Sequence, residues 1–150
     1  MQSHASRLRD RVLAAIELPA LGIWLGALAG FAFVAAPVTF RIIAPVDVER
    51  FSTVIVGQLG ILTTWGYVLG AIAFITELLQ RAPGRAVLVA VAIALAFYHQ
   101  HVVVQAMLGI ADVTSPAYRA LHGRSTQIYG AVVVLLLVTT VWAAASSRRP

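Results

Sequence analysis

Four long stretches without a charged residue alternate with short charged segments along the chain. The uncharged stretches cover residues 18–40, 51–76, 86–111 and 125–147. A helix needs about 20 apolar residues to cross about 30 Å of hydrocarbon, so each stretch is long enough to span a bilayer. Backbone groups in lipid must be satisfied within the segment, and no stretch alternates like a barrel strand. The pattern predicts an all-α integral membrane protein, an antiparallel bundle of four transmembrane helices.

Local signals predict where these helices begin and end. Asp47 is a typical N-cap for the second helix, and Ser115 followed by Pro116 is typical of the start of the fourth. The Pro83-Gly84 pair predicts a short turn, so the second and third helices form an antiparallel hairpin. We expect a single membrane domain over residues 1–150, with spans over about 19–40, 51–77, 86–110 and 125–146.

The segment before the first span has its own pattern. Over residues 5–17, Leu8, Val12 and Ile16 fall on one face of a helix. We expect an amphipathic segment that lies on the inner membrane surface before Pro19 begins the first span. The alternative is a frayed basic tail. Glu17, at the end of this segment, is expected at the level of the lipid headgroups.

Composition agrees with a membrane environment. Apolar residues make up 60% of the 150 residues and charged residues 11%, against roughly 45–50% and about 25% in soluble domains. So few charges could not cover a soluble surface, which excludes a water-soluble enzyme, a disordered chain and a conventional nucleic-acid-binding domain. The chain has no cysteine, which excludes disulfides and thiolate metal sites. It also lacks the common hydrolase and nucleotide-binding motifs, so we expect no enzymatic activity.

The basic residues are all arginine, and they divide unequally between the two sides of the predicted bundle. Of 11 arginines, four lie on the side of the first and third loops. The other seven lie on the side of the termini: Arg7, Arg9, Arg11, Arg81, Arg85, Arg148 and Arg149. The positive-inside rule then places both termini in the cytoplasm, as in a multi-pass protein of a bacterial inner (cytoplasmic) membrane. The net charge of +5 is assigned to topology and anionic headgroups, and no nucleic-acid partner is expected.

Small residues indicate the helix-packing faces. Gly22, Gly26 and Gly30 form a tandem GxxxG row in the first helix, and Gly66 and Gly70 repeat the spacing in the second. Such rows allow two helix backbones to approach closely in lipid. We expect the first and second helices to pack on each other within the bundle; the alternative is a dimer interface.

Polar side chains gather at the outer ends of the third and fourth helices. In the third, His101, Gln105 and Asp112 share one helical face. In the fourth, the residues that share a face are Tyr118, His122, Ser125 and Tyr129. If the two faces meet, they form one outer polar pocket. His99 lies about 200° around the helix from His101 and is expected to face a neighbouring helix or the outer interface instead.

Three interpretations of this pocket remain open. Its side chains can hydrogen-bond across helices and fix their register, a structural role. His101 and His122, with Asp112, could instead hold haem b or a divalent metal, although two histidines and one carboxylate are a weak signature. The third interpretation is a polar route for a proton or a small solute. No resident cofactor is predicted outside the second interpretation.

Three short motifs suggest a family. Their residues are Trp24 and Gly26 in the first helix, Pro37 and Phe40 at its end, and Leu121, His122 and Ser125 entering the last helix. Together they resemble the transmembrane-protein-205-like family, the bacterial domain of unknown function 4149. The resemblance implies a small protein with four spans and draws attention to His122. It implies no established reaction or cofactor.

The sequence therefore predicts a non-enzymatic integral membrane protein, an accessory or scaffold subunit that packs against other membrane proteins or itself within the lipid bilayer. The first alternative is an oligomeric membrane protein that handles a small solute or an ion. The second is a binder of haem or metal through the outer-side histidines His101 and His122.

Overall fold

The computed structural model describes residues 4–44 and 46–147. Arg148 and Arg149, two members of the predicted basic set, lie outside the described residues. Within them the chain is all-helical, and four helical rods are long and apolar enough to cross a membrane. These rods cover Leu8–Ile43, Thr53–Leu79, Pro83–Leu108 and Pro116–Ser147. The prediction of four helices of membrane-spanning length is confirmed.

The first rod is longer than its predicted span. It consists of α1 (His4–Gly30), the π-helical segment η1 (Phe31–Ala35) and α2 (Ala36–Ile43). Pro19 lies inside α1, so the predicted amphipathic segment over residues 5–17 continues straight into the span and does not end before Pro19. A proline removes one backbone donor but its fixed φ is helical, so a long helix supported by its neighbours can contain one.

The second rod begins and ends as its sequence signals predict. It is α3 (Val48–Leu79), and the Asp47 side chain caps it by accepting a hydrogen bond from the Arg50 backbone N–H at 2.8 Å. The turn to the next rod is short, and Arg81 takes a positive φ of 57° within it. This compact turn places α3 beside the following helix.

The third rod contains a local change of helix type. It consists of α4 (Pro83–Tyr98), the π-helical segment η2 (His99–Val104) and α5 (Gln105–Leu108). The fourth rod, α6 (Pro116–Ser147), begins at the predicted proline, and the Ser115 hydroxyl accepts a hydrogen bond from the Tyr118 backbone N–H at 3.2 Å. The η2 segment contributes the buried residues His99, Val103 and Val104 to the bundle.

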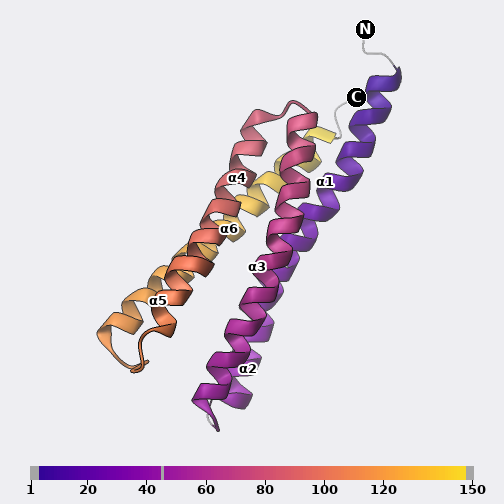
Figure 1. Cartoon of the computed structure of the whole chain (residues 1–150). Helices are drawn as coiled ribbons and strands as arrows, with labels where there is room; N and C mark the ends of the chain where they lie inside the picture. Colours follow the sequence, from indigo (N-terminus) through magenta and orange to yellow (C-terminus); the bar gives the residue numbers. More distant parts are fainter. Residues whose placement is uncertain (1–3, 45, 148–150) are drawn as a thin grey trace.

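The rods form a closed arrangement in which each has two neighbours. α1 packs on α3 and α6, and α4 packs on the same two helices. The described ends of α1 and α6 lie at one end of the molecule with the α3–α4 turn, which we call the terminal end (Figure 1). The α2–α3 and α5–α6 connections lie at the opposite end, the loop end (Figure 1).

Trp24 occupies the centre of the packed layer between these ends. Its side chain is 2% exposed and lies against α3 at Gly66 and Gly70. A Cβ atom at Gly66 would lie 2.6 Å from the indole Nε1, and one at Gly70 would lie 2.8 Å from Cζ3. The glycines of α3 therefore make room for a large aromatic side chain, which is a packing role within the bundle.

The glycine row of α1 has a different position. A Cβ atom at Gly22, Gly26 or Gly30 would meet no other atom within 4 Å. These residues therefore point away from the other rods, and the expectation that both glycine rows pack inside the bundle holds only for α3. The difference arises because Trp24, between the glycines of α1, turns its own face of the helix toward α3.

Candidate ligand-binding cavity

A cavity of about 750 Å³ opens at the loop end of the molecule. One side is formed by η1, α2 and α3, and the other by η2, α5 and α6. Apolar side chains such as Phe31, Leu59 and Met107 form most of the wall, and Ile110 and Val113 of the α5–α6 connection border it. Its size lies within the range of about 300–1,000 Å³ that is typical of small-molecule sites.

His99 is the most deeply placed polar group of the cavity wall. It is 5% exposed, and its Nε2 lies 2.7 Å from the Ser125 hydroxyl oxygen of α6. Which of the two atoms donates depends on the tautomer of the imidazole. The Tyr129 ring stands edge-on to the imidazole, with the ring centroids 6.1 Å apart. His99 therefore links the third rod to α6 at Ser125, a member of the polar face predicted for the fourth helix.

The polar stripe predicted on the fourth helix lies on the cavity. Tyr118, His122, Ser125 and Tyr129 all line it. The rings of Tyr118 and His122 are nearly parallel, at 7°, with centroids 6.3 Å apart. The Tyr129 hydroxyl donates to the Leu28 carbonyl oxygen at 2.9 Å, which ties α6 to α1. The periodicity of this helix was sufficient to bring these four residues together.

The polar stripe predicted on the third helix lies elsewhere. His101, Gln105 and Asp112 are exposed and do not line the cavity. The His101 ring instead packs on Phe97, with centroids 4.4 Å apart. The predicted pocket that joins His101 to His122 is therefore corrected, because His99 takes the inward place and His101 lies about 200° around the helix from it.

Asp112 falls beyond the end of the helical rod, where a helical wheel no longer applies. Its carboxylate accepts hydrogen bonds from the Thr114 backbone N–H at 2.8 Å and from the Thr114 hydroxyl at 2.6 Å. These hydrogen bonds lower the pKa of Asp112 below its usual value. Asp112 thus organises the α5–α6 connection and supplies no ligand to the cavity.

A signal for His99 was present in the sequence. Val89, Ala92, His99 and Val103 are all buried and recur at intervals of three, four or seven residues. Following this apolar row, rather than the polar residues alone, places His99 on the inward face. The polar row was misleading because exposed polar residues near a membrane surface also follow helical periodicity.

The lining suits a neutral molecule. No arginine, aspartate or glutamate lines the cavity among the residues that the structure describes. In the same part of the chain, no three metal-ligating side chains come together. The two imidazoles on the wall are those of His99 and His122. An apolar wall with a few neutral hydrogen-bonding groups favours a mostly apolar ligand that carries one or two polar atoms.

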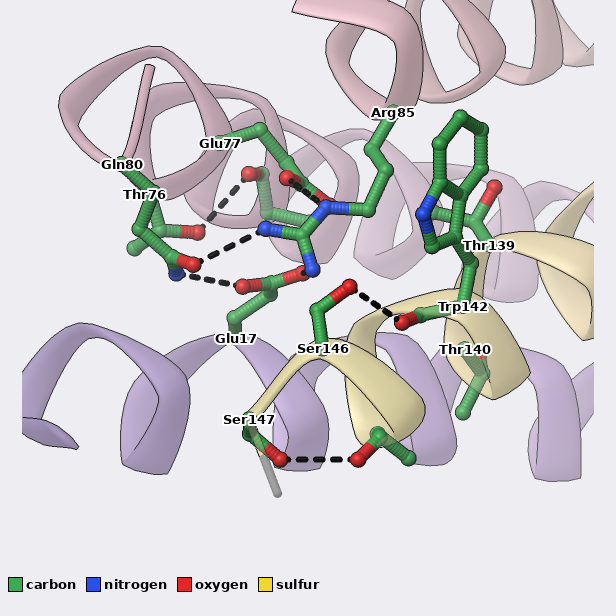
Figure 2. Close-up of polar contacts among 12 residues, drawn as sticks. Glu17, Thr76, Glu77, Gln80, Arg85, Thr139, Thr140, Trp142, Ser146 and Ser147 are labelled. Carbon is green, nitrogen blue, oxygen red and sulfur yellow. Dashed lines mark hydrogen bonds and ion pairs between the residues drawn. The ribbon is translucent and has the colours of Figure 1, made fainter. Parts of the chain in front are cut away.

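A second polar region, at the terminal end, was not anticipated. Figure 2 shows Glu17, Glu77, Gln80 and Arg85 turned toward one another from α1, the end of α3 and α4. Glu17 was expected at headgroup level, but it is 1% exposed. Arg85, counted above among the arginines that indicate topology, is buried with it. Local sequence gave no signal because the three elements meet only in the folded chain.

Comparison with known proteins gives the chain no relatives from which a function could be read. No family model, no curated protein and no solved structure matches it. Membership of the transmembrane-protein-205-like family, suggested by the short motifs around Trp24, Pro37 and His122, stays a prediction.

Proposed function

We propose that this chain is an integral membrane protein, an antiparallel bundle of four transmembrane helices, that binds a small neutral amphiphile in the loop-end cavity. The observation that carries the proposal is the cavity itself, about 750 Å³ of mostly apolar lining with the part-buried His99–Ser125 pair on its wall. It develops the small-solute alternative of the sequence analysis. An apolar body fills the cavity, and a carbonyl or hydroxyl group hydrogen-bonds to the polar wall.

The polar wall favours a neutral ligand over a charged one. A charged group brought into an apolar cavity loses its hydration and needs an opposite charge to compensate it. The described lining offers only neutral hydroxyl, phenol and imidazole groups. A Ser125 hydroxyl can donate one hydrogen bond and accept others, so it can hold His99 and still serve a ligand atom. Neutral hydrogen bonding supplies orientation, and the apolar wall supplies affinity.

The distribution of arginines supports one orientation for the site. In the sequence, seven of the 11 arginines lie on the side of the termini and four on the side of the first and third loops, and the positive-inside rule places the arginine-rich side on the cytoplasmic face. The cavity then lies in the outer half of a bacterial inner membrane. In this position it would receive its ligand from the outer leaflet or from the outer surface.

Binding can be tested with the full chain in lipid nanodiscs and a short-chain benzoquinone as the probe, because this molecule is neutral, mostly apolar and carries two carbonyl groups. Nanodiscs that contain the protein should retain more probe than empty ones in equilibrium dialysis. Ser125→Ala should weaken retention about threefold to tenfold, because a hydrogen-bonding group worth about 0.5–1.5 kcal/mol is removed. Met107→Trp, which fills the cavity, should abolish it.

The matched control for the hydroxyl is Ser146→Ala. Ser146 lies at the terminal end and donates to the Trp142 carbonyl oxygen of its own helix, so its loss should leave retention unchanged. Retention that equals that of empty nanodiscs, or that survives Met107→Trp, would contradict the proposal.

The haem or metal alternative now concerns a different pair of residues. It would require His99 and His122, because His101 does not line the cavity. An absorption spectrum and a metal analysis of the purified protein test it. A Soret band or bound metal that is lost in His122→Ala and kept in His101→Ala would favour this alternative over a neutral organic ligand.

A second candidate function, an accessory or scaffold subunit, is favoured by the outward glycine row of α1. Gly22, Gly26 and Gly30 leave a surface on which another helix could approach closely. Gly26→Leu should reduce self-association or co-purification under mild detergent. Gly57→Leu is the matched control, since a Cβ atom there also meets nothing within 4 Å. A solitary monomer in all variants would contradict this function.

A further inference from the structure

The terminal end contains a cluster of buried charges that the proposed cavity does not use. Glu17 of α1 is 1% exposed, Glu77 of α3 is 0% exposed and Arg85 of α4 is 5% exposed. Gln80, just beyond α3, lies among them (Figure 2). We call these four residues the terminal cluster. Charged side chains are rarely buried this completely unless they neutralise one another.

Arg85 is the centre of the contacts. Its Nε lies 2.7 Å from Oε2 of Glu77, and its Nη1 lies 3.8 Å from Oε1 of Glu17. Its Nη2 donates to Oε1 of Gln80 at 2.9 Å, and the Gln80 amide in turn donates to Oε2 of Glu17. One guanidinium therefore faces two carboxyl groups, one of them partly through a glutamine.

The cluster has one more acid than base. Among the described residues, the ion pairs to Glu17 and Glu77 come from Arg85. The α6 side chains drawn beside the cluster, Trp142 and Ser146 among them, are neutral (Figure 2). The next charged side chains along α1 and the α3–α4 turn, Arg11 and Arg81, are exposed. With both acids ionised, the cluster would carry an uncompensated negative charge.

Carboxyl oxygen atoms without a hydrogen-bond partner indicate where the uncompensated negative charge lies. Oε1 of Glu77 and Oε1 of Glu17 are buried and accept no hydrogen bond from the protein. Oε2 of Glu77 is close to Arg85, but the guanidinium N–H is not aligned for a hydrogen bond with it. The carboxyl groups of Glu17 and Glu77 are held by the same guanidinium, at 3.8 Å and 2.7 Å. Two carboxylates this close to one cation in a dry site repel each other strongly unless one of them is protonated.

We propose that the terminal cluster is a proton-binding site, in which Glu17 and Glu77 share one exchangeable proton and Arg85 neutralises the remaining negative charge. A proton suits the site better than a metal cation. The guanidinium already occupies the space between the two carboxyl groups, and the Gln80 carbonyl oxygen is taken by Arg85. A cation would lack ligands and would be repelled by Arg85, whereas a proton supplies the missing donor.

The protonation state of the terminal cluster determines how strongly α1 is attached to the α3–α4 hairpin. Glu17 is the contribution of α1 to the cluster, whereas Glu77, Gln80 and Arg85 belong to the α3–α4 hairpin. Loss of the proton leaves a net negative charge at this junction and weakens the attachment of α1. The pH on the terminal side of the membrane therefore sets the strength of the contact between α1 and the hairpin.

The first test is the pH dependence of stability for the full chain in mixed micelles, measured by tryptophan fluorescence and by circular dichroism. Unfolded glutamates are ionised at neutral pH, so the folded state would hold one more proton than the unfolded state. Stability should therefore fall as pH rises, and the unfolding equilibrium constant should grow by about tenfold per pH unit. Glu77→Gln and Glu17→Gln should each flatten this dependence, because each leaves one carboxylate opposite one guanidinium.

The matched control is Asp10→Asn, which removes a surface carboxylate of α1 that pairs with Arg9 and should leave the slope intact. A flat profile in the unmodified protein would overturn the proposal. So would a slope that persists in both glutamine variants. Stabilisation by sodium or potassium at fixed pH that disappears in Glu77→Gln would identify a metal cation in place of the proton.

Infrared difference spectroscopy of the folded protein gives a second measurement that does not depend on unfolding. Raising the pH should remove a protonated-carboxyl C=O band and produce a carboxylate band. The protonated-carboxyl band should be absent from Glu17→Gln and Glu77→Gln and unchanged in Asp10→Asn. Absence of any such band in the unmodified protein would overturn the proposal even if a glutamine variant failed to fold.

Discussion

The two ends of the molecule place polar groups in the apolar bundle in opposite ways. At the loop end, neutral side chains such as His99, Ser125 and His122 border a cavity of about 750 Å³. At the terminal end, Glu17, Glu77 and Arg85 pack directly against one another. Neutral groups can line a space because an unmade hydrogen bond costs far less than an unpaired buried charge, which must lie close to its counter-charge.

The terminal end therefore contributes mainly to stability, and the loop end contributes mainly to ligand binding. The terminal end has its polar groups in mutual contact and joins α1 to the α3–α4 hairpin. The loop end places polar groups such as the Ser125 hydroxyl on the wall of a cavity, where an added molecule can reach them. Between the ends lies the layer in which Trp24 packs against Gly66 and Gly70. Changes at the terminal end should therefore alter stability first, and changes at the loop end should alter binding first.

The largest effect is expected from Arg85→Gln, which leaves two buried carboxyl groups without their counter-charge. Breaking a buried ion pair in this way costs about 3–5 kcal/mol of unfolding free energy. Denaturation in mixed micelles at neutral pH measures it, with Arg81→Gln as the control because Arg81 is exposed in the adjoining turn. Equal stability of the two variants would show that the terminal cluster does not hold the bundle together.

A smaller effect is expected in the layer between the ends. Gly66→Ala places a Cβ atom 2.6 Å from the Trp24 indole, and such overpacking costs about 1–3 kcal/mol. Gly22→Ala is the control, because a Cβ atom there meets nothing within 4 Å. The comparison is made by Trp24 fluorescence during denaturation. Similar losses in both variants would mean that α3 does not pack on Trp24 as described.

At the loop end, Tyr129→Phe should change stability less than either of these. It removes the hydroxyl that donates to the Leu28 carbonyl oxygen at 2.9 Å, a loss of about 1 kcal/mol. Tyr98→Phe, at a more exposed position of α4, should have no measurable effect. A loss as large as that of Arg85→Gln would contradict the division of roles between the two ends.

The smallest effect is expected from Asp112→Asn in the α5–α6 connection. Hydrogen bonds from Thr114 lower the pKa of Asp112 in the folded protein. Its contribution to stability is therefore present above the usual pKa of a carboxyl group and disappears as the pH falls through the lowered value. Stability of the two proteins, measured at neutral pH and at strongly acidic pH, should differ only slightly and only at neutral pH. A difference that grows on acidification would reverse the predicted sign.

The features that the sequence predicted correctly are those encoded within one helix. The lengths of the apolar stretches predicted four helices of membrane-spanning length, and local capping residues predicted the starts of α3 at Asp47 and of α6 at Ser115. The α6 stripe that contains His122 and Ser125 followed from regular α-helical periodicity. Each of these depends on residues a few positions apart, and their physics is the same before and after the helices pack.

The features that were not predicted from the sequence depend on how the helices pack against one another. His99 replaced His101 because the inward face of the third rod is set by the apolar row that contains Val89, Ala92 and Val103. The outward direction of Gly26 could not be read from a GxxxG row, since the same row serves packing inside or outside a bundle.

Four apolar helices follow from the amino-acid sequence without any tertiary contact, because hydrophobic length and caps act locally. The packing of the helices brings Glu17, separated by 60 residues or more from Glu77 and Arg85 along the chain, into one buried site with them, and it turns His99 toward a cavity. Charge compensation and cavity formation are properties of contacts between helices. They arise only when distant segments exclude lipid and water from the space between them.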